Sequence, residues 1–377
     1  MDYYCRNCGA EYTQLPTGMR CCCGASLWMR YPHRLTKESI RKEDFSMWRY
    51  ASALPGASDI FRVSLGEGLT PLVPVAWGDR TIWVKNESQE PTGSFKDRGT
   101  ALVISYEKHR GTKRVSEDSS GNAGASVAAY AARADISCEI YVPDYTSRGK
   151  VVQAMAYGAK VHKVAGSRDH TAEVAQRSSN GCVYIGHNWH PAFVEGVKTL
   201  AFELWEQSGF QVPDAVICAV GNGSVAIGLY LGFLDLLNSG QISRLPRIYG
   251  VQSKNCNTIC RTFRGESVNY TVQPTLAEGI ALYRSSKAKE TASLIRETGG
   301  KMIDVSEQQI ETALQQLFRN GFFAEPTSAA AFAGLNSLIE SGELPPAQRV
   351  CVTLSGNGLK ATQKILDMFS WEAEEDV

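Results

Sequence analysis

The chain has 377 residues, of which 21% are charged, and its formal net charge is +0 at pH 7. This length predicts two or three folding units, and the balanced charge argues against nucleic acid or an anionic membrane as a partner. No apolar run approaches the roughly 20 residues of a membrane-spanning helix, and the amino terminus lacks the basic and apolar segments of a secretory signal. We therefore expect a cytoplasmic globular protein.

Five of the 11 cysteines cluster near the amino terminus. Cys5 and Cys8 form one close pair, and Cys21, Cys22 and Cys23 follow after 12 residues. Two close thiolate pairs at turns are typical of a structural zinc site with four sulfur ligands. A glycine follows both Cys8 and Cys23, so we assign Cys5, Cys8, Cys21 and Cys23 as the ligands, with Cys22 as the alternative to Cys23. Reduced thiols without a metal are the other interpretation.

Beyond this cluster, residues 31 to about 60 are polar and aromatic and are expected to form a linker and docking segment. Strand-like and helix-like stretches then alternate along most of the chain. We expect strands at 81–85, 138–143, 160–164, 214–220, 247–252 and 349–354, and helices at 127–133, 150–157 and 193–206. This alternation predicts a parallel α/β architecture with more than one sheet.

The most informative segment is 90–99, Glu-Pro-Thr-Gly-Ser-Phe-Lys-Asp-Arg-Gly, which places Lys96 between a Pro/Gly turn and a helical stretch. A lysine at a helix start feels the positive end of the helix dipole, which disfavours its ammonium form and makes its amine a better nucleophile. Such an amine forms Schiff bases with aldehydes, and pyridoxal phosphate (PLP) is the commonest aldehyde partner. Lys96 is therefore the candidate catalytic and cofactor-binding residue, and an ordinary surface lysine is the alternative.

A serine- and glycine-rich turn before a predicted helix fits the substrate side of such a site. Ser119, Ser120 and Gly121 offer small side chains and free amides at a helix start, which suit a substrate carboxylate. The amide of Asn122 can reach the phenolic oxygen of PLP. Taken alone, this turn is better explained as a plain helix N-cap.

Two further segments fit the phosphate and the ring of the cofactor. A glycine-rich loop between a predicted strand and a predicted helix has the geometry for holding a phosphate on backbone N–H groups. Its residues are Gly221, Asn222, Gly223, Ser224 and Val225. Ser355 follows the last predicted strand and is placed to hydrogen-bond the pyridine nitrogen. A hydroxyl at that position leaves the ring unprotonated, which favours elimination and replacement over transamination.

Together these motifs resemble the fold-type-II PLP enzymes of the tryptophan synthase β-like superfamily, and specifically the threonine synthase-like group. The matching pieces are the Lys96 motif, residues 118–122, the loop from Gly221, residues 325–329 (Glu-Pro-Thr-Ser-Ala) and residues 355–358 (Ser-Gly-Asn-Gly). The resemblance implies the cofactor and substrate roles given above. It also implies that Lys96 both holds PLP and transfers the proton of the substrate.

The resemblance also implies a domain organisation. Several threonine synthase-like proteins carry a zinc ribbon, which we expect over residues 1–30. The family fold has two α/β domains with PLP between them. We therefore expect a large PLP-binding domain from residues 31–98 and 191–370, a small α/β domain from residues 99–190, and a frayed acidic tail at 371–377. Family habit suggests a homodimer.

The chain departs from threonine synthases at the site for the phosphate of the substrate. Threonine synthases that act on O-phosphohomoserine carry a serine and an arginine for this phosphate just before a Glu-Gly-x-Lys-Thr stretch. Aligned on Pro191 and Lys198, the two positions hold Asn188 and Phe193 here. Because a phenyl ring cannot replace a guanidinium that binds a phosphate dianion, we expect this phosphate-binding pair to be missing.

The same stretch predicts a pocket adapted to another side chain, with a packed loop before a helix as the alternative. The candidate pocket residues are His187, Trp189, His190 and Phe193. A second departure is the stretch 275–281, Thr-Leu-Ala-Glu-Gly-Ile-Ala, which is similar to the corresponding stretch of threonine and serine dehydratases. It makes Glu278 a candidate contact for the amino acid or the ring.

The expected reaction is a PLP-dependent elimination or replacement at Cβ or Cγ of a small amino acid, after Lys96 has removed the α-proton. A threonine/serine dehydratase-like deaminase is the first alternative. A non-catalytic PLP-binding relative is the second, although intact Lys96, Asn122 and Ser355 argue against it. The leaving group and the nucleophile remain open at this point.

Overall fold

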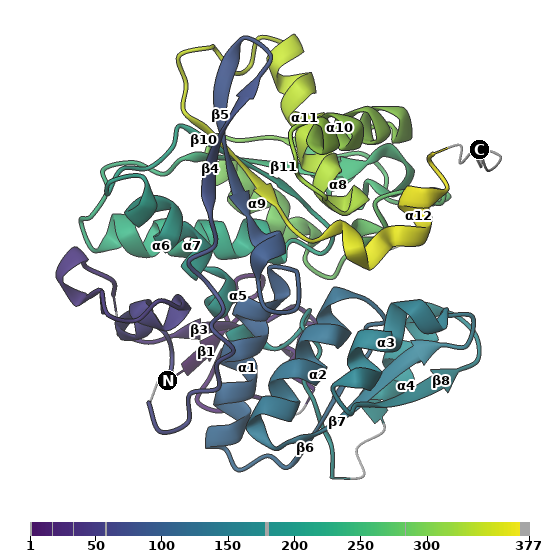
Figure 1. The fold of residues 1–377 in the computed structure, drawn as a ribbon. Coiled ribbons are helices and arrows are strands. Elements are labelled where there is room, and N and C mark those ends of the chain that lie inside the picture. Colours follow the sequence, from purple (N-terminus) through teal and green to yellow (C-terminus); the bar gives the residue numbers. More distant parts are fainter. Residues whose placement is uncertain are drawn as a thin grey trace, which may run out of the picture.

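The computed structural model describes residues 2–16, 18–32, 34–56, 59–177, 181–282 and 284–369. They contain a three-stranded, a six-stranded and a four-stranded sheet, which confirms the expected α/β class (Figure 1). The predicted acidic tail at 371–377 lies outside the described residues. Within the described ranges, no helix combines the length and apolar character needed to cross a membrane.

The six-stranded sheet is parallel except for one edge strand. Its order is β12 (Met302–Val305), β11 (Arg247–Ser253), β10 (Ala215–Ala219), β13 (Val350–Leu354), β5 (Arg80–Asn86) and β4 (Leu72–Trp77). Strands β10 and β13 are buried along their whole length, as expected for central strands of a sheet covered on both faces. Strand β4 is antiparallel to β5. It contains Pro74, which an edge strand tolerates and which hides this strand from pattern analysis.

The four-stranded sheet is parallel and lies apart from the six-stranded one (Figure 1). Its order is β8 (Lys160–Val164), β7 (Ser137–Pro143), β6 (Arg114–Glu117) and β9 (Val183–Tyr184). The chain between these strands forms α2 (Asn122–Ala134), α3 (Arg148–Ala156) and α4 (Arg168–Arg177). Helix α2 is rich in alanine, and its small buried side chains let it pack closely against β7.

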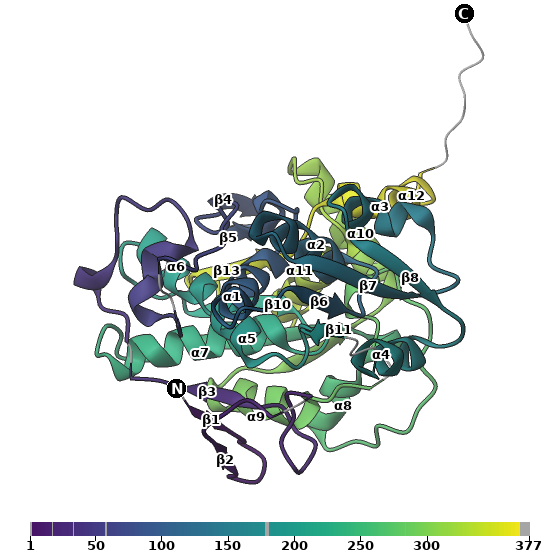
Figure 2. The same cartoon turned by 90° about the horizontal axis from the view of Figure 1, so that it is seen from below.

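The remaining helices pack between and around the two larger sheets (Figure 2). They are α1 (Lys96–His109), α5 (Pro191–Val197), α6 (Thr199–Gln207), α7 (Ser224–Asn238), α8 (Thr258–Arg264), α9 (Ala288–Glu297), α10 (Glu307–Arg319), α11 (Pro326–Glu340) and α12 (Thr362–Leu366). The single helix expected at 193–206 is therefore two helices that meet at Lys198. It also begins earlier than expected, because Pro191 occupies the first turn, where proline is favoured.

The amino-terminal part docks onto the two larger sheets and their helices. Strands β1 (Asp2–Tyr4), β2 (Glu11–Tyr12) and β3 (Trp28–Arg30) form a small antiparallel sheet. The segment after it is more ordered than a linker: the 3₁₀ helix η2 (Met47–Ala53) is mostly buried. Within it, Trp48 is 1% exposed, and its indole N–H donates to Glu67 Oε1 at 2.6 Å.

Helices α1 and α5 cross at two glycines, and this crossing positions the site. A Cβ on Gly196 would lie 2.1 Å from the carbonyl oxygen of Arg98, and a Cβ on Gly99 would lie 2.5 Å from the ring of Phe193. Larger residues would force the two helices apart. The close approach holds Phe193 against the first turn of α1, where Lys96 lies.

Candidate active site

Three predicted site segments follow three neighbouring parallel strands. The loop that leads to Lys96 follows β5, Ser355 follows β13, and the loop from Gly221 follows β10. The carboxyl ends of parallel strands lie at one edge of a sheet, where α/β proteins bind their ligands. Backbone hydrogen bonds join the first two segments, because Phe95 N–H donates to the Ser355 carbonyl at 3.1 Å.

Lys96 is the first residue of α1, as the sequence predicts. Burial lowers the pKa of its amine to about 8, the nearby carboxyl of Glu117 opposes this shift, and Arg168 adds to it. The cause is thus mainly burial rather than the helix dipole invoked from the sequence. The Nζ atom lies 4.8 Å from the ring centre of Phe95 and 5.4 Å from that of Phe193. At neutral pH the free-base fraction of this amine is therefore far larger than that of an ordinary lysine, whose pKa is about 10.5.

Asn122 and Ser355 come together on one buried carboxyl group. The Asn122 amide donates to Glu325 Oε2 at 3.0 Å, and the Ser355 hydroxyl donates to Glu325 Oε1 at 3.2 Å. Ser328 adds a hydroxyl 3.1 Å from that of Ser355. Burial raises the pKa of Glu325. Asn122 begins α2 beside the four-stranded sheet, whereas Ser355 follows the six-stranded one, so the two sheets meet at this carboxyl group.

The glycine loop has the geometry of an anion site. It leads directly into α7, whose first N–H groups have no partner within the helix. Gly223 has a φ of +97°, and a Cβ there would lie 2.2 Å from Thr291 Oγ1. The Asn222 side chain is held beside the loop, because the Ser285 hydroxyl donates to its Oδ1 at 2.5 Å. The backbone amides of the loop and the hydroxyl of Ser224, the first residue of α7, are therefore the groups that can bind a phosphate here.

The predicted substrate-binding residues fall into two groups. Ser119, Ser120 and Gly121 directly precede Asn122, and the Gly121 N–H donates to the Ser119 hydroxyl at 3.3 Å. His187 packs against Phe193 with their ring centres 5.7 Å apart. These residues belong to the surroundings of Asn122 and of Lys96.

Trp189, His190 and Glu278 have other partners. The guanidinium of Arg20 stacks 3.7 Å over the ring of Trp189. His190 caps α5, since its Nδ1 accepts from Ala192 N–H at 3.2 Å. Glu278 pairs with Lys150 at 2.7 Å and with Lys364 at 2.9 Å, and its side chain is 44% exposed. None of these contacts joins the three side chains to Lys96.

One important residue is missing from the sequence-based site. Glu117, the last residue of β6, is fully buried, and its carboxylate is bonded by both the backbone and the ring of His187. Burial raises its pKa to about 7. An acidic residue at the end of a strand, next to the Ser119 turn, is the signal that could have pointed to it.

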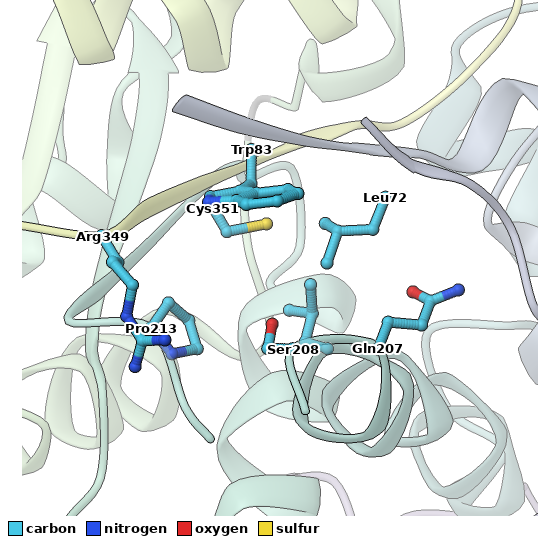
Figure 3. A pocket seen from close by; sticks show the side chains of 8 residues that line it. Leu72, Trp83, Gln207, Ser208, Pro213, Arg349 and Cys351 are labelled. Carbon is cyan, nitrogen blue, oxygen red and sulfur yellow. The ribbon is translucent and has the colours of Figure 1, made fainter. Parts of the chain in front are cut away.

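A separate cavity of about 190 Å³ lies elsewhere in the fold (Figure 3). It lies between the end of α6 and the first residues of β13, and Trp83 and Cys351 are among the side chains that line it. None of the predicted site residues lines it. We therefore assign the active site to the sheet edge around Lys96 and not to this cavity.

The four predicted metal ligands lie close together. The sulfur atoms of Cys5, Cys8, Cys21 and Cys23 are all within 4.8 Å of one another, and Cys22 is outside the group. The Cys5–Cys23 and Cys8–Cys21 sulfur pairs are 3.6 and 3.4 Å apart. Tetrahedral zinc with Zn–S bonds of about 2.3 Å places its sulfur ligands about 3.8 Å apart. The cluster is therefore compatible with one zinc ion.

The arrangement around Lys96 fits PLP. It combines a buried amine of lowered pKa, an amide and a hydroxyl that converge from two sheets, and a helix start that can hold a phosphate. A two-sheet α/β protein with these groups at the carboxyl edge of its strands has the features of a fold-type-II PLP enzyme.

Comparison with known proteins also identifies the chain as a PLP-dependent enzyme. The family described as "Pyridoxal-phosphate dependent enzyme" matches residues 63–356, and the chain belongs to this family. It is 34% identical to the threonine synthase of Methanocaldococcus jannaschii, over 94% of this chain and 92% of that protein. It is 32% identical to the threonine synthase of Methanosarcina acetivorans, over 97% and 93%. The chain is thus a PLP-dependent enzyme that resembles threonine synthases.

Solved structures share the fold. The threonine deaminase of T.th. superposes with a TM-score of 0.65 at 26% identity, and the match covers 76% of this chain and 92% of that one. The serine racemase of Dictyostelium discoideum has a TM-score of 0.65 and 22% identity, with the same coverage. The similarity to the racemase shows the fold alone.

Proposed function

We propose that this enzyme catalyses elimination or replacement at Cβ or Cγ of a small amino acid whose leaving group is not a phosphate. The observation that carries the proposal is the buried phenyl ring of Phe193, 5.4 Å from Lys96 Nζ. In O-phosphohomoserine enzymes an arginine is expected at this position. An apolar ring beside the reacting amine offers no charge or hydrogen bond to a phosphate dianion.

The roles of the surrounding residues follow from their positions. PLP, when bound, supplies an electron sink that makes the Cα–H bond and the bond to the leaving group labile. Lys96 binds the cofactor and, as a free base, accepts the proton from Cα. The N–H groups of residues 221–225 bind the phosphate of the cofactor, Asn122 and Ser355 orient its ring, and Ser119–Gly121 bind the carboxylate of the substrate.

A substrate panel tests the proposal. The cofactor-loaded protein is titrated with O-phosphohomoserine, O-phosphoserine, threonine and serine while the visible spectrum, phosphate and keto acid are followed. We expect spectral changes only with unphosphorylated amino acids. Saturable phosphate release with threonine formation would contradict the proposal. Keto acid and ammonia without a second substrate would identify the deaminase alternative. In the Phe193→Arg variant, a gain of affinity for O-phosphohomoserine would support the assignment of this position.

We propose in addition that Cys5, Cys8, Cys21 and Cys23 bind one structural zinc ion. We expect metal analysis of protein purified without chelator to find about one zinc per chain. Cys23→Ser should lose most of this metal, because an alcohol is a far weaker zinc ligand than a thiolate. Cys22→Ser is the matched control and should keep it. Equal zinc content in the two variants would contradict the assignment.

Domain boundaries, assembly and location remain proposals. We propose a ribbon at 1–30, a large domain from residues 31–98 and 191–370 and a small domain from residues 99–190, since the strands of the four-stranded sheet all fall within 114–184. We also propose a cytoplasmic homodimer. Sedimentation of the loaded protein at several concentrations tests the dimer, and a single species of 41 kDa would contradict it.

A further inference from the structure

Glu117 and His187 form a buried pair that none of the roles above uses. The two residues are 70 positions apart in the chain, and β6 and the loop before α5 bring them together. His187 Nδ1 lies 3.0 Å from Glu117 Oε1, and the His187 backbone N–H donates to Glu117 Oε2 at 3.0 Å. This double attachment fixes both the position of the imidazole and its orientation.

The other side of the imidazole is available for chemistry. Within the described part of the chain, Nε2 of His187 has no hydrogen-bond partner. The His187 ring packs on Phe193 with their centres 5.7 Å apart, and Lys96 Nζ lies 5.4 Å from the centre of the same Phe193 ring. Both groups therefore pack against one phenyl ring, and the charge of Lys96 lowers the pKa of His187, which indicates that the imidazole lies near the reacting amine. One of its nitrogens is held by Glu117.

The charges around the pair favour a neutral imidazole. Burial, and then the charge of Lys96, lowers the pKa of His187 well below its ordinary value, whereas burial raises the pKa of Glu117 to about 7. Arg168 and Lys287 also disfavour an imidazolium ion, and Asp118 favours it. Near neutral pH the pair therefore exists in two forms that differ by one proton, both with a neutral imidazole. In one, Glu117 is protonated and the imidazole carries its proton on Nε2; in the other, Glu117 is a carboxylate and the imidazole carries its proton on Nδ1.

We propose that Glu117 and His187 form a proton relay that protonates a basic leaving group as its bond to carbon breaks. In this step the C–O bond of the substrate breaks and its electron pair stays on oxygen. That oxygen takes the proton from His187 Nε2, and Nδ1 takes the proton of Glu117. The products are a neutral leaving molecule, a neutral imidazole and the Glu117 carboxylate. When a nucleophile adds, its proton returns to Glu117 by the reverse path.

The relay indicates the class of substrate, and this inference rests on the proposed function. Phosphate is a less basic leaving group than hydroxide, which leaves only when an acid gives it a proton. An enzyme that lacks the phosphate-binding arginine and carries an acid beside Phe193 is suited to an amino acid with a free hydroxyl at Cβ or Cγ. The base, Lys96, and the acid, His187, are then separate groups.

Nuclear magnetic resonance of the cofactor-loaded protein tests the relay without any turnover. Protein with ¹⁵N-labelled histidine has six imidazoles, and the His187→Gln variant identifies the relevant one. We expect His187 to carry its proton on Nε2 at low pH and on Nδ1 at high pH, with the change near the Glu117 pKa of about 7. The change should vanish in Glu117→Gln. One tautomer throughout the pH range would overturn the relay.

A comparison of leaving groups separates the relay from a structural role. We expect His187→Gln to slow elimination from serine by about 10²–10⁴-fold, the usual contribution of a general acid. Elimination of chloride from 3-chloro-L-alanine should change far less, because chloride needs no proton. His190→Gln is the control, since His190 is also a buried histidine beside a glutamate, Glu107, at 3.4 Å. It should affect both substrates equally.

Two outcomes of this comparison have distinct meanings. Equal losses on serine and 3-chloro-L-alanine in His187→Gln would overturn the relay and leave the proposed function intact. If the wild-type protein eliminates neither group, the proposed reaction at Cβ fails. The tautomer measurement then still decides whether Glu117 and His187 share a proton.

Discussion

Replacement of Lys96 by alanine should abolish the covalent attachment of PLP and reduce turnover by on the order of 10²–10⁴-fold, because the variant loses the group that accepts the proton from Cα. The absorption of the wild-type holoenzyme in the visible range should be absent or shifted in the variant after gel filtration. Steady-state assays with the substrate found in the panel measure the loss of turnover. Retention of both properties would show that another amine is used.

The lowered pKa of Lys96 also has a consequence for stability in the cofactor-free protein. The folded amine titrates near pH 8, and the unfolded amine near its ordinary value of 10.5. Between these values the unfolded chain binds more protons than the folded chain, so stability rises with pH across this window and is lost as the pH falls through about 8. Lys96→Met should lack this slope in chemical denaturation measured at several pH values. A slope of equal size in both proteins would assign the effect to other groups.

Arg98→Ala should destabilise the protein by about 3–5 kcal/mol, because it leaves buried carboxylates without their counter-charge. The guanidinium bonds Glu87 at 2.6 and 2.8 Å and Glu203 at 2.5 and 2.8 Å, and these side chains are at most 1% exposed. Lys85 adds a bond to Glu203 at 2.7 Å. Burial alone would raise the pKa of Glu203, but Arg98 and Lys85 lower it to about 2. Urea denaturation of the cofactor-free protein measures the loss.

Glu90 is a third carboxyl group beside the Arg98 guanidinium. Its carboxyl lies 3.1 Å from the Arg98 guanidinium. Burial raises its pKa well above the ordinary value despite that neighbour. This shift favours the neutral form of Glu90, so Glu87 and Glu203 are the main counter-charges of Arg98. Arg98 lies in the first turn of α1, two residues from Lys96, so Arg98→Ala should also weaken the binding of PLP at Lys96.

An exposed ion pair provides the control for Arg98. Arg177 and Glu173 lie 3.7 Å apart on α4, with side chains that are 81% and 57% exposed. Arg177→Ala should change the free energy of unfolding by less than about 0.5 kcal/mol, because water and salt screen such a pair. A loss from Arg98→Ala as small as that from Arg177→Ala would contradict the importance assigned to the buried network.

Local sequence patterns were enough to predict the fold class and to propose several site residues. The run around Lys96, the glycine loop from Gly221 and the spacing of the four cysteines are short motifs whose meaning depends on neighbouring residues. The strand at 138–143 was predicted because buried strands carry continuous apolar side chains. Strand β4 was missed because its proline contradicts the usual pattern of a strand.

The sequence by itself therefore determined the α/β class, and it made Lys96 and the cysteine cluster candidate sites. Only the tertiary structure decided which distant side chains meet. It joins Glu117 to His187 and Asn122 to Glu325, 70 and 203 positions apart, and it gives Glu278 two lysine partners. It also lowers the pKa of Lys96 mainly through burial. Burial and long-range contacts arise from the packing of the whole chain, so no local pattern contains them.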